Sequence, residues 1–310
     1  MIRLEDNIKN ANAVTHSGKF HADDVFSTVI VDKYLGDVNL VRVPEFKGDG
    51  SEDIIVYDIG GGKFDHHQVG GNGSRGRNNV PYAAGGLLWR EFGPEILKPY
   101  YQPERVWEAI EESLIQPIDA HDNGRFAKGG VLSPSIIVAL MNQHWNADED
   151  SNECFLRATK FAELTFDAVF KDALSKIEAE PIVLNAIDNA SERIMILDKN
   201  VPWKDCVLKR YIGLARGINA VVFPDRRSNY CFQFFANSAS DFSKAPSAPV
   251  TWRGLENEDL QQITGVETAK FCHQQGFIGG AETLDDAVKL AKMSIEYTYM
   301  DEGFSKKRRK

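Results

Sequence analysis

The sequence predicts an α/β protein of two domains. The N-terminal domain is a parallel sheet with helices on both faces, and the smaller C-terminal domain is mixed α+β. In the first half, short apolar runs alternate with amphipathic runs, as strands and helices do in a parallel sheet. After Pro181, short apolar runs follow one another without that alternation. A chain of 310 residues that is 43% hydrophobic is long enough for two cores.

The first-half elements follow from this alternation. Residues 13–15 are predicted as a strand, and residues 25–35 as a helix whose apolar side chains share one side. Residues 40–43 and 54–57 are predicted as the next two strands. Polar residues follow the first and third of these strands, at the carboxyl edge where open α/β sheets bind ligands.

Two further segments complete the first half. Residues 68–79 are almost entirely Gly, Asn, Ser and Arg, which predicts a mobile loop that packs no core. Residues 104–118 carry apolar side chains at helical spacing after Pro103, which predicts a helix that delivers Asp119 to its C-terminal end.

The second half begins after a bridging helix predicted at 152–179. We expect domains at 1–180 and 181–310. The predicted elements of the second domain are four strands, at 182–184, 194–197, 220–223 and 231–235, and a final helix from Leu284 to about Tyr299.

Composition restricts the class of protein. A net charge of −9 argues against broad non-specific attraction to nucleic acid. No run approaches the roughly 20 apolar residues that cross a bilayer, so no membrane partner is expected, and the first residues are too polar for a secretory leader. The four cysteines lie far apart, which favours reduced thiols and a cytoplasmic location. A homo-oligomer stays open.

Histidines and aspartates form polar clusters that are typical of a metal site. Five of the seven histidines fall into three such clusters. Their members are His16 and His21 with Asp23 and Asp24, then His66 and His67 after Asp65, and His121 between Asp119 and Asp122.

Each cluster suggests a role. The first cluster occupies a turn between a strand and a helix, where Asp24 is either functional or only a helix cap or second-layer partner. Asp58 follows four apolar residues, and a carboxylate fixed in this way suits a bridge between two cations roughly 3.5 to 4 Å apart. Adjacent His66 and His67 point in different directions on extended backbone, so that one binds metal and the other faces substrate.

Mixed imidazole and carboxylate donors without thiolates favour Mn, Fe, Co or Zn over Ca and argue against a structural zinc site. We expect two divalent ions, Mn first, with Mg, Fe, Co or Zn as alternatives. Two ions would activate a bridging water and stabilise the departing oxygen of a phosphoester.

The triplet Asp65-His66-His67, together with the motifs at His16 to Asp23, Asp58 and Asp119, resembles the DHH phosphoesterase superfamily. That superfamily includes RecJ-type exonucleases, oligoribonucleases and family II pyrophosphatases. The spelling of the motifs is similar to the branch of the melanocyte proliferating gene protein, often labelled "metal-dependent protein hydrolase". Second-half segments that share this similarity are Val201-Pro202-Trp203, Trp252-Arg253-Gly254-Leu255 and Gly276-Phe277-Ile278-Gly279-Gly280.

The resemblance implies a DHH-type catalytic first domain and a set of ligands. One ion would be bound by His16, His21 and Asp58, and the other by Asp23, Asp58, His66 and Asp119. Either Asp119 or Asp122 would be the metal ligand from this segment. His121 and Asp122 would otherwise contact the ligands without binding the ion. His67 would touch the scissile phosphate, and the predicted catalytic residues are His67, Asp65 and Asp24. In the wider superfamily the place of His21 usually holds an Asp.

Substrate contacts are expected from Arg75 and Arg77 on the Gly-rich loop, and from Arg253, Gly279 and Gly280 in the second domain. Paired glycines allow backbone N–H groups to approach a phosphate, although Gly279 and Gly280 also suit a plain turn. Arg253 binds phosphate or is solvated on a loop.

The leading hypothesis is a metal-dependent phosphodiesterase, exonuclease-like, that acts on short single-stranded RNA or DNA or on nucleotides. The alternatives are a pyrophosphatase or phosphomonoesterase, which would need a more basic pocket, and a metal-binding protein without catalysis. No feature of the sequence supports a peptide-binding cleft.

Overall fold

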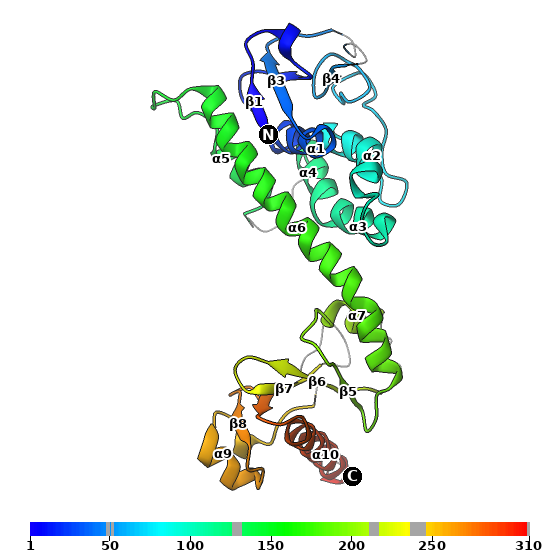
Figure 1. The fold of residues 1–310 in the computed structure, drawn as a ribbon, viewed down its shortest axis with the longest axis vertical. Coiled ribbons are helices and arrows are strands. Elements are labelled where there is room, and N and C mark those ends of the chain that lie inside the picture. Colours follow the sequence, from blue (N-terminus) through cyan, green and yellow to red (C-terminus); the bar gives the residue numbers. More distant parts are fainter. Residues whose placement is uncertain (48–49, 51–52, 126–131, 211–216, 236–245, 309–310) are drawn as a thin grey trace. The chain divides into compact units, whose positions relative to one another are not determined.

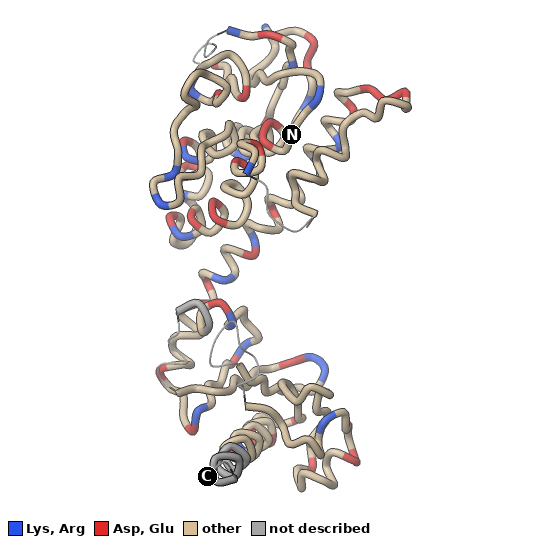
Figure 2. Tube along the Cα trace, turned by 180° about the vertical axis from the view of Figure 1, so that it is seen from behind, with Lys and Arg blue, Asp and Glu red and all other residues tan. Residues whose placement is uncertain are grey.

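The computed structural model describes the chain except residues 48–49, 51–52, 126–131, 211–216, 236–245 and 309–310 (Figure 1). Its contacts divide the chain into two compact units, Met1–Ile177 and Glu178–Lys310. Basic and acidic residues are interspersed along the traces of both units (Figure 2).

The first unit contains a parallel sheet whose order is β1-β3-β2-β4. Its strands are β1 (Ile2–Leu4), β2 (Ala13–His16), β3 (Val38–Val43) and β4 (Ile55–Val56). Val14 of β2 lies between Val41 and Val56 in register, so β2 and β4 are parallel neighbours. The three strands predicted here are confirmed, as is the α/β class, and the residues that follow β2 and β4 meet at the same edge.

Helix α1 (Ala22–Leu35) packs against β2 and β3 and against α2 (Ala84–Leu97). Every residue from Ala22 to Val31 is buried, because α1 has neighbours on several sides. The helix begins where the Asp24 carboxylate accepts a hydrogen bond from the His21 amide at 2.8 Å, and it ends at Gly36, whose φ is +84°. The predicted helix is confirmed, with one more turn at its start.

The helix predicted at 104–118 consists of three consecutive segments. They are α3 (Pro103–Ile110), a π-helical segment (Glu111–Ile115) and α4 (Gln116–Asp122), followed by α5 (Pro134–Leu140). Single π-helical turns inside longer helices occur frequently at functional sites. Here the π-helical turn places Glu111 inward, 7% exposed, while Asp119 lies in α4.

The Gly-rich loop at 68–79 is packed at its centre, contrary to the prediction that it packs no core. Arg75 is only 7% exposed, and its backbone N–H and C=O bond to Val80 and Asn79. The prediction was wrong because composition alone could not show that two carboxylates, described below, compensate a buried guanidinium. Arg77 is exposed as expected.

Helix α6 (Ser151–Asp188) contains the predicted bridging helix and continues past Pro181 into the second unit. The strand predicted at 182–184 is therefore wrong. Val183 and Ile187 are buried four residues apart, which is helical spacing. A three-residue apolar run suits either a strand or a buried helical turn, so the sequence alone did not distinguish them.

The second unit contains a mixed sheet of order β5-β6-β7-β9-β8 (Figure 1). Among its described strands, β5 and β6 pair in parallel, and the other neighbours pair antiparallel. Helix α10 packs against β6, β7 and β9. The other predicted strands and the start of the final helix are confirmed. The elements of this unit are β5 (Ile194–Ile196), α7 (Lys204–Arg210), β6 (Ala220–Asp225), β7 (Asn229–Phe234), a short 3-10 turn (Val250–Trp252), α9 (Asn257–Thr264), β8 (Ala269–Cys272), β9 (Ile278–Ala281) and α10 (Leu284–Arg308). The first unit also has a short 3-10 turn at Ile8–Asn10.

Strands β8 and β9 were not predicted. Gly279 and Gly280 lie inside β9, paired with β7 on one side and β8 on the other, and so do not form the plain turn considered above. Among the described residues, no helix has both the length and the apolar character needed to cross a bilayer.

Candidate metal centre

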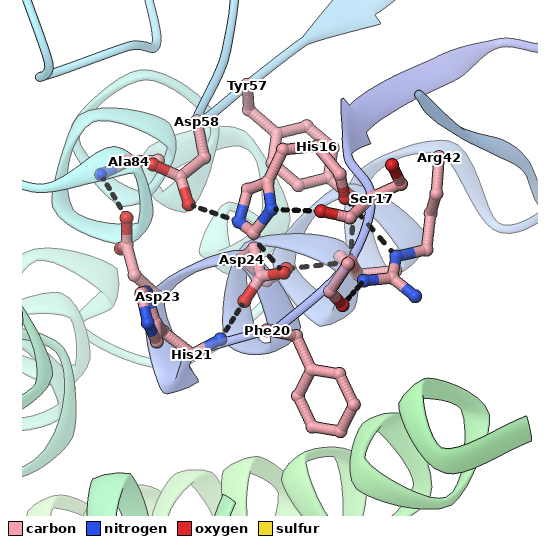
Figure 3. Close-up of polar contacts among 12 residues, drawn as sticks. His16, Ser17, Phe20, His21, Asp23, Asp24, Arg42, Tyr57, Asp58 and Ala84 are labelled. Atoms are coloured by element: carbon pink, nitrogen blue, oxygen red, sulfur yellow. Dashed lines mark hydrogen bonds and ion pairs between the residues drawn. The ribbon is translucent and has the colours of Figure 1, made fainter. Parts of the chain in front are cut away.

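The carboxyl ends of β2 and β4 place His16 and Asp58 beside each other (Figure 3). Asp58 has a φ of +56°, and its amide donates to the carbonyl of Phe64 at 3.0 Å. A left-handed conformation is unfavourable for a residue other than glycine, so the local fold must hold it in place. This turn directs the Asp58 carboxylate out of the strand toward the histidines.

The Asp58 carboxylate lies between three imidazoles. Its Oδ2 is 3.3 Å from His16 Nε2, whereas its Oδ1 is 3.4 Å from His66 Nε2 and 3.4 Å from His67 Nδ1. Each oxygen thus faces a different set of donors, as a carboxylate that bridges two cations would require.

Side chains form three groups, and within each group the donor atoms lie within 4.8 Å of one another. Asp58 belongs to two of the groups, and His66 links one of these to the group that contains Asp23. Oxygen and nitrogen donors of this kind suit Mn, Fe, Co or Zn. The groups are His16, Asp24 and Asp58; Asp58, His66 and His67; and Asp23, His66 and Asp122.

Buried carboxylates give the site its strong negative character. Asp23 and Asp24 are fully buried and Asp58 is 4% exposed. Asp24 Oδ2, Asp58 Oδ1 and His66 Nε2 are buried, and among the described residues they make only long contacts of 3.2 to 3.7 Å with the imidazole and carboxylate groups that face them. Because buried charges are paired or bound to metals, these unsatisfied atoms fit a divalent cation.

Proton affinities reflect the same crowding of charge. Burial raises the pKa of Asp24 to about 7, and burial together with Asp58 and Asp122 raises the pKa of Asp23 well above its usual range. Although burial opposes it, the hydrogen bond to Asp58 and the charge of Asp24 raise the pKa of His16 to about 9. Against the effect of burial, hydrogen bonds from His16 and His66 lower the pKa of Asp58 to about 2.

The N-terminus of α2 fixes the carboxylates of Asp23 and Asp119, and this role of α2 was not predicted from the sequence. The amides of Ala84 and Gly85 donate to the two oxygens of Asp23 at 2.8 and 2.7 Å, and the Gly86 amide donates to Asp119 at 3.1 Å. Helix N-termini favour negative charge because their first N–H groups are unpaired. The only indication in the sequence is the pair Gly85-Gly86 at the start of an apolar run.

Asp122 and Asp119 occupy different positions. Asp122 Oδ2 lies 3.2 Å from His66 Nε2, inside one of the donor groups. Asp119 is fully buried and pairs with Arg75 Nη1 at 2.8 Å, and it belongs to none of the three groups. Burial raises the pKa of Asp119 to about 7 although Arg75 acts in the opposite direction.

His21 and Asp24 also differ from the ligand set that the resemblance implies. The structure groups Asp24, and not His21, with His16 and Asp58. Asp24 in addition caps α1, since its other oxygen accepts from the His21 amide. The His21 side chain is 54% exposed and its Nδ1 lies 3.7 Å from Asp122 Oδ1. Together with Asp122 and His121 it lines a cavity of about 190 Å³.

Asp65 faces His67 and the preceding turn. Its carboxylate accepts from the Gly61 amide at 2.7 Å, from the His67 amide at 3.0 Å and from His67 Nδ1 at 2.9 Å. Although burial acts in the opposite direction, these N–H groups hold the pKa of Asp65 below its ordinary value. Asp65 thus orients an imidazole that is 61% exposed at the edge of the centre.

The residues expected to contact substrate belong to both units and differ in exposure. Arg75 is buried, and the Arg77 side chain is 92% exposed. In the second unit, Arg253 donates to Ala248 O at 3.1 Å and to Ser247 Oγ at 2.9 Å, which ties down a loop. Gly279 and Gly280 lie in β9, paired on both sides.

Comparison with known proteins gives a match over most of the chain. A family model named MYG1_exonuc, described as an uncharacterised protein family (UPF0160), matches residues 12–295. The MYG1 protein YER156C of Saccharomyces cerevisiae is 29% identical over 94% of this chain and 98% of its own length. The MYG1 protein C694.04c of Schizosaccharomyces pombe is 28% identical over 91% of this chain and 97% of its own length. The MYG1 exonuclease of Homo sapiens is 26% identical over 91% of this chain and 85% of its own length. No solved structure matches the chain.

Proposed function

The chain belongs to the MYG1 exonuclease family (UPF0160), and from that premise and the His–Asp centre we propose that it is a divalent-metal-dependent phosphodiesterase. Its proposed substrates are short single-stranded RNA or DNA, or nucleotides, cleaved from an end. Relatives named MYG1 exonuclease support the exonuclease-like chemistry. The observation that carries the proposal is Asp58, whose two oxygens face separate sets of nitrogen and oxygen donors.

We propose two ion positions on either side of Asp58, with Mn as the first choice. His16 and Asp24 would complete one position, and Asp23, His66 and Asp122 the other, with His21 beside Asp122 at its margin. When bound, the ions would lower the pKa of a water molecule to near neutrality and stabilise the negative charge on the leaving oxygen.

The protein's own residues prepare the site for a phosphate. Asp65 holds His67 through Nδ1 and the ring is 61% exposed, so the rest of the imidazole is free to face a scissile phosphate. The backbone amides of α2 fix Asp23 before substrate arrives, which reduces the reorganisation needed during the reaction. The exposed Arg77 is the proposed contact of the Gly-rich loop with the phosphate backbone.

We also propose a cytoplasmic location, because the four cysteines are free thiols, as is usual for proteins of a reducing compartment. For Arg253, Gly279 and Gly280, engagement in loop and sheet hydrogen bonds favours a structural role in the second unit over a direct contact with substrate.

The test is hydrolysis by the full-length chain loaded with Mn²⁺. Labelled oligoribonucleotides and oligodeoxyribonucleotides of a few residues, cyclic dinucleotides and pyrophosphate are supplied separately. We expect stepwise shortening of one of the oligonucleotides, reduced in His67→Ala and retained in His144→Ala, which changes another exposed histidine. Phosphate release from pyrophosphate alone would favour the pyrophosphatase alternative. Absence of turnover on every substrate, with Mn²⁺ shown to be bound, would overturn the proposal.

A further inference from the structure

Arg75 is a buried arginine in a segment whose composition predicts a mobile, substrate-binding loop. The residue is 7% exposed, and Tyr82 lies against its guanidinium, with Cζ 4.4 Å from the ring centroid. Its Nη1 also donates to the carbonyl of Pro81 at 3.3 Å. Arg75 is therefore enclosed by its own loop and is poorly placed to meet a phosphate backbone.

Two carboxylates from different helical segments complete its surroundings. Arg75 Nε donates to Glu111 in the π-helical segment, and Arg75 Nη1 pairs with Asp119 Oδ2 in α4 at 2.8 Å. Both carboxylates are buried. A planar guanidinium can bond to two acceptors at fixed angles, which a lysine ammonium cannot reproduce.

The other oxygen of Asp119 connects this pair to α2. Asp119 Oδ1 accepts from the Gly86 amide at 3.1 Å. A Cβ at Gly86 would lie 1.9 Å from Asp119 Oδ2 and 2.7 Å from Arg75 Nη2, so only glycine allows the three groups to meet. The arginine, the aspartate and the start of α2 thus form one close-packed unit.

The same helix start holds Asp23, a member of the metal centre. The amides of Ala84 and Gly85, adjacent to Gly86, bind both oxygens of Asp23. Any rotation of the α2 N-terminus would move these amides and with them the Asp23 carboxylate. Without Arg75, the buried Asp119 carboxylate would lose the guanidinium that holds its Oδ2, and its hydrogen bond to the Gly86 amide would no longer be fixed.

We infer that Arg75 is a positioning residue of the metal centre, which acts through Asp119 and the N-terminus of α2 to fix the carboxylate of Asp23. It does not bind substrate. The inference rests on the proposed function, because both assign this centre to divalent metal. Its principal test is metal binding, which is measured without turnover.

The experiment compares Arg75→Gln and Arg75→Lys with Arg77→Gln, an exposed arginine on the same loop. Mn²⁺ binding is measured by calorimetry and by electron paramagnetic resonance of free Mn²⁺, and folding by circular dichroism. We expect Arg75→Gln to raise the Kd for Mn²⁺ by roughly 10- to 100-fold, which is typical when a residue that orients a metal ligand is lost. Arg75→Lys should show a smaller rise, and Arg77→Gln none.

A double variant separates two routes by which Arg75 could act. In Arg75→Gln with Glu111→Gln, one positive and one negative buried charge are removed together, so the fold is less perturbed than in the single variant. Asp119 still lacks its partner, and we expect Mn²⁺ binding to stay weak. A wild-type Kd in the double variant would show that Arg75 only neutralises Glu111, which would overturn the inference.

Steady-state kinetics at saturating Mn²⁺ give an independent readout. Arg75→Gln should lower kcat and leave KM for the oligonucleotide unchanged, whereas Arg77→Gln should raise KM. Wild-type Mn²⁺ affinity in Arg75→Gln with a raised KM would instead make Arg75 a substrate residue. If the wild-type protein hydrolyses no phosphoester but the order of Mn²⁺ affinities holds, the proposed function fails and the inference stands.

Discussion

Replacing Asp58 by Asn removes the carboxylate that faces both groups of donors. The histidines lower the pKa of Asp58 from its ordinary 3.8 to about 2. A lowered pKa contributes stability that is present above pH 3.8 and lost as the pH falls through 2, so it is present at pH 7. A difference of almost two pKa units corresponds to roughly 2 kcal/mol. For the metal-free Asp58→Asn variant this predicts a Tm lower by roughly 4 to 8 °C.

Metal binding should amplify the difference. Mn²⁺ at about 100 times its Kd would stabilise the wild-type protein by about 2.7 kcal/mol, and the variant should show almost none of this increase. Loss of several kcal/mol of transition-state stabilisation would lower kcat on the order of 10³-fold.

Differential scanning fluorimetry with and without Mn²⁺, together with oligonucleotide hydrolysis, measures both effects. The matched control is Asp6→Asn, which neutralises an exposed carboxylate. A full Mn²⁺-dependent rise in Tm for Asp58→Asn would refute the bridging role, because the variant would then bind metal without that carboxylate.

Three further outcomes are expected. In chelator-treated protein, the raised pKa of His16 contributes stability that is complete below pH 6.5 and lost as the pH rises through about 9. Thermal melts should therefore show a Tm that falls over that interval. The increase in Tm that Mn²⁺ causes should become larger over the same interval, because the cation competes with protons for the site. Arg42→Ala removes the hydrogen bond to Gly18 O at 2.9 Å and the contact with the Phe155 ring at 4.2 Å. The variant should lower the free energy of unfolding in urea by about 2 kcal/mol and weaken Mn²⁺ binding. An unchanged midpoint of urea unfolding would count against this prediction. Gly279→Ala places a Cβ 2.5 Å from the Phe232 ring and should cost about 1 to 3 kcal/mol, whereas Gly76→Ala, with no atom within 4 Å, should be neutral in the same melts.

The fold of the first unit was largely predictable because its strands end in polar residues. Val14 and Val56 are buried strand residues, and the chain turns to His16 and Asp58 immediately after them. Clustering of histidine and aspartate in such turns was visible without coordinates, and so was their common edge. The sequence could not separate Asp119 from Asp122, because both lie in α4 and only the neighbours in space differ.

Features that depend on distant partners were not predictable. The burial of Arg75 requires Glu111 and Asp119, more than 30 residues away, and local composition indicated the opposite. The continuation of α6 through Pro181 depends on burial of Val183 against the second core, which a short apolar run does not reveal. The position of Gly279 inside a strand follows from the Phe232 ring packed against it.

The central claim is that Asp58 joins two sets of ligands around divalent metal. Anomalous diffraction from crystals soaked in Mn²⁺ tests it most directly, because the ion is located without reference to activity. We expect two peaks roughly 3.5 to 4 Å apart, one on each side of the Asp58 carboxylate, with His16 beside the first and His66 beside the second. Absence of any peak between these residues, with Mn²⁺ bound elsewhere on the chain, would contradict the claim.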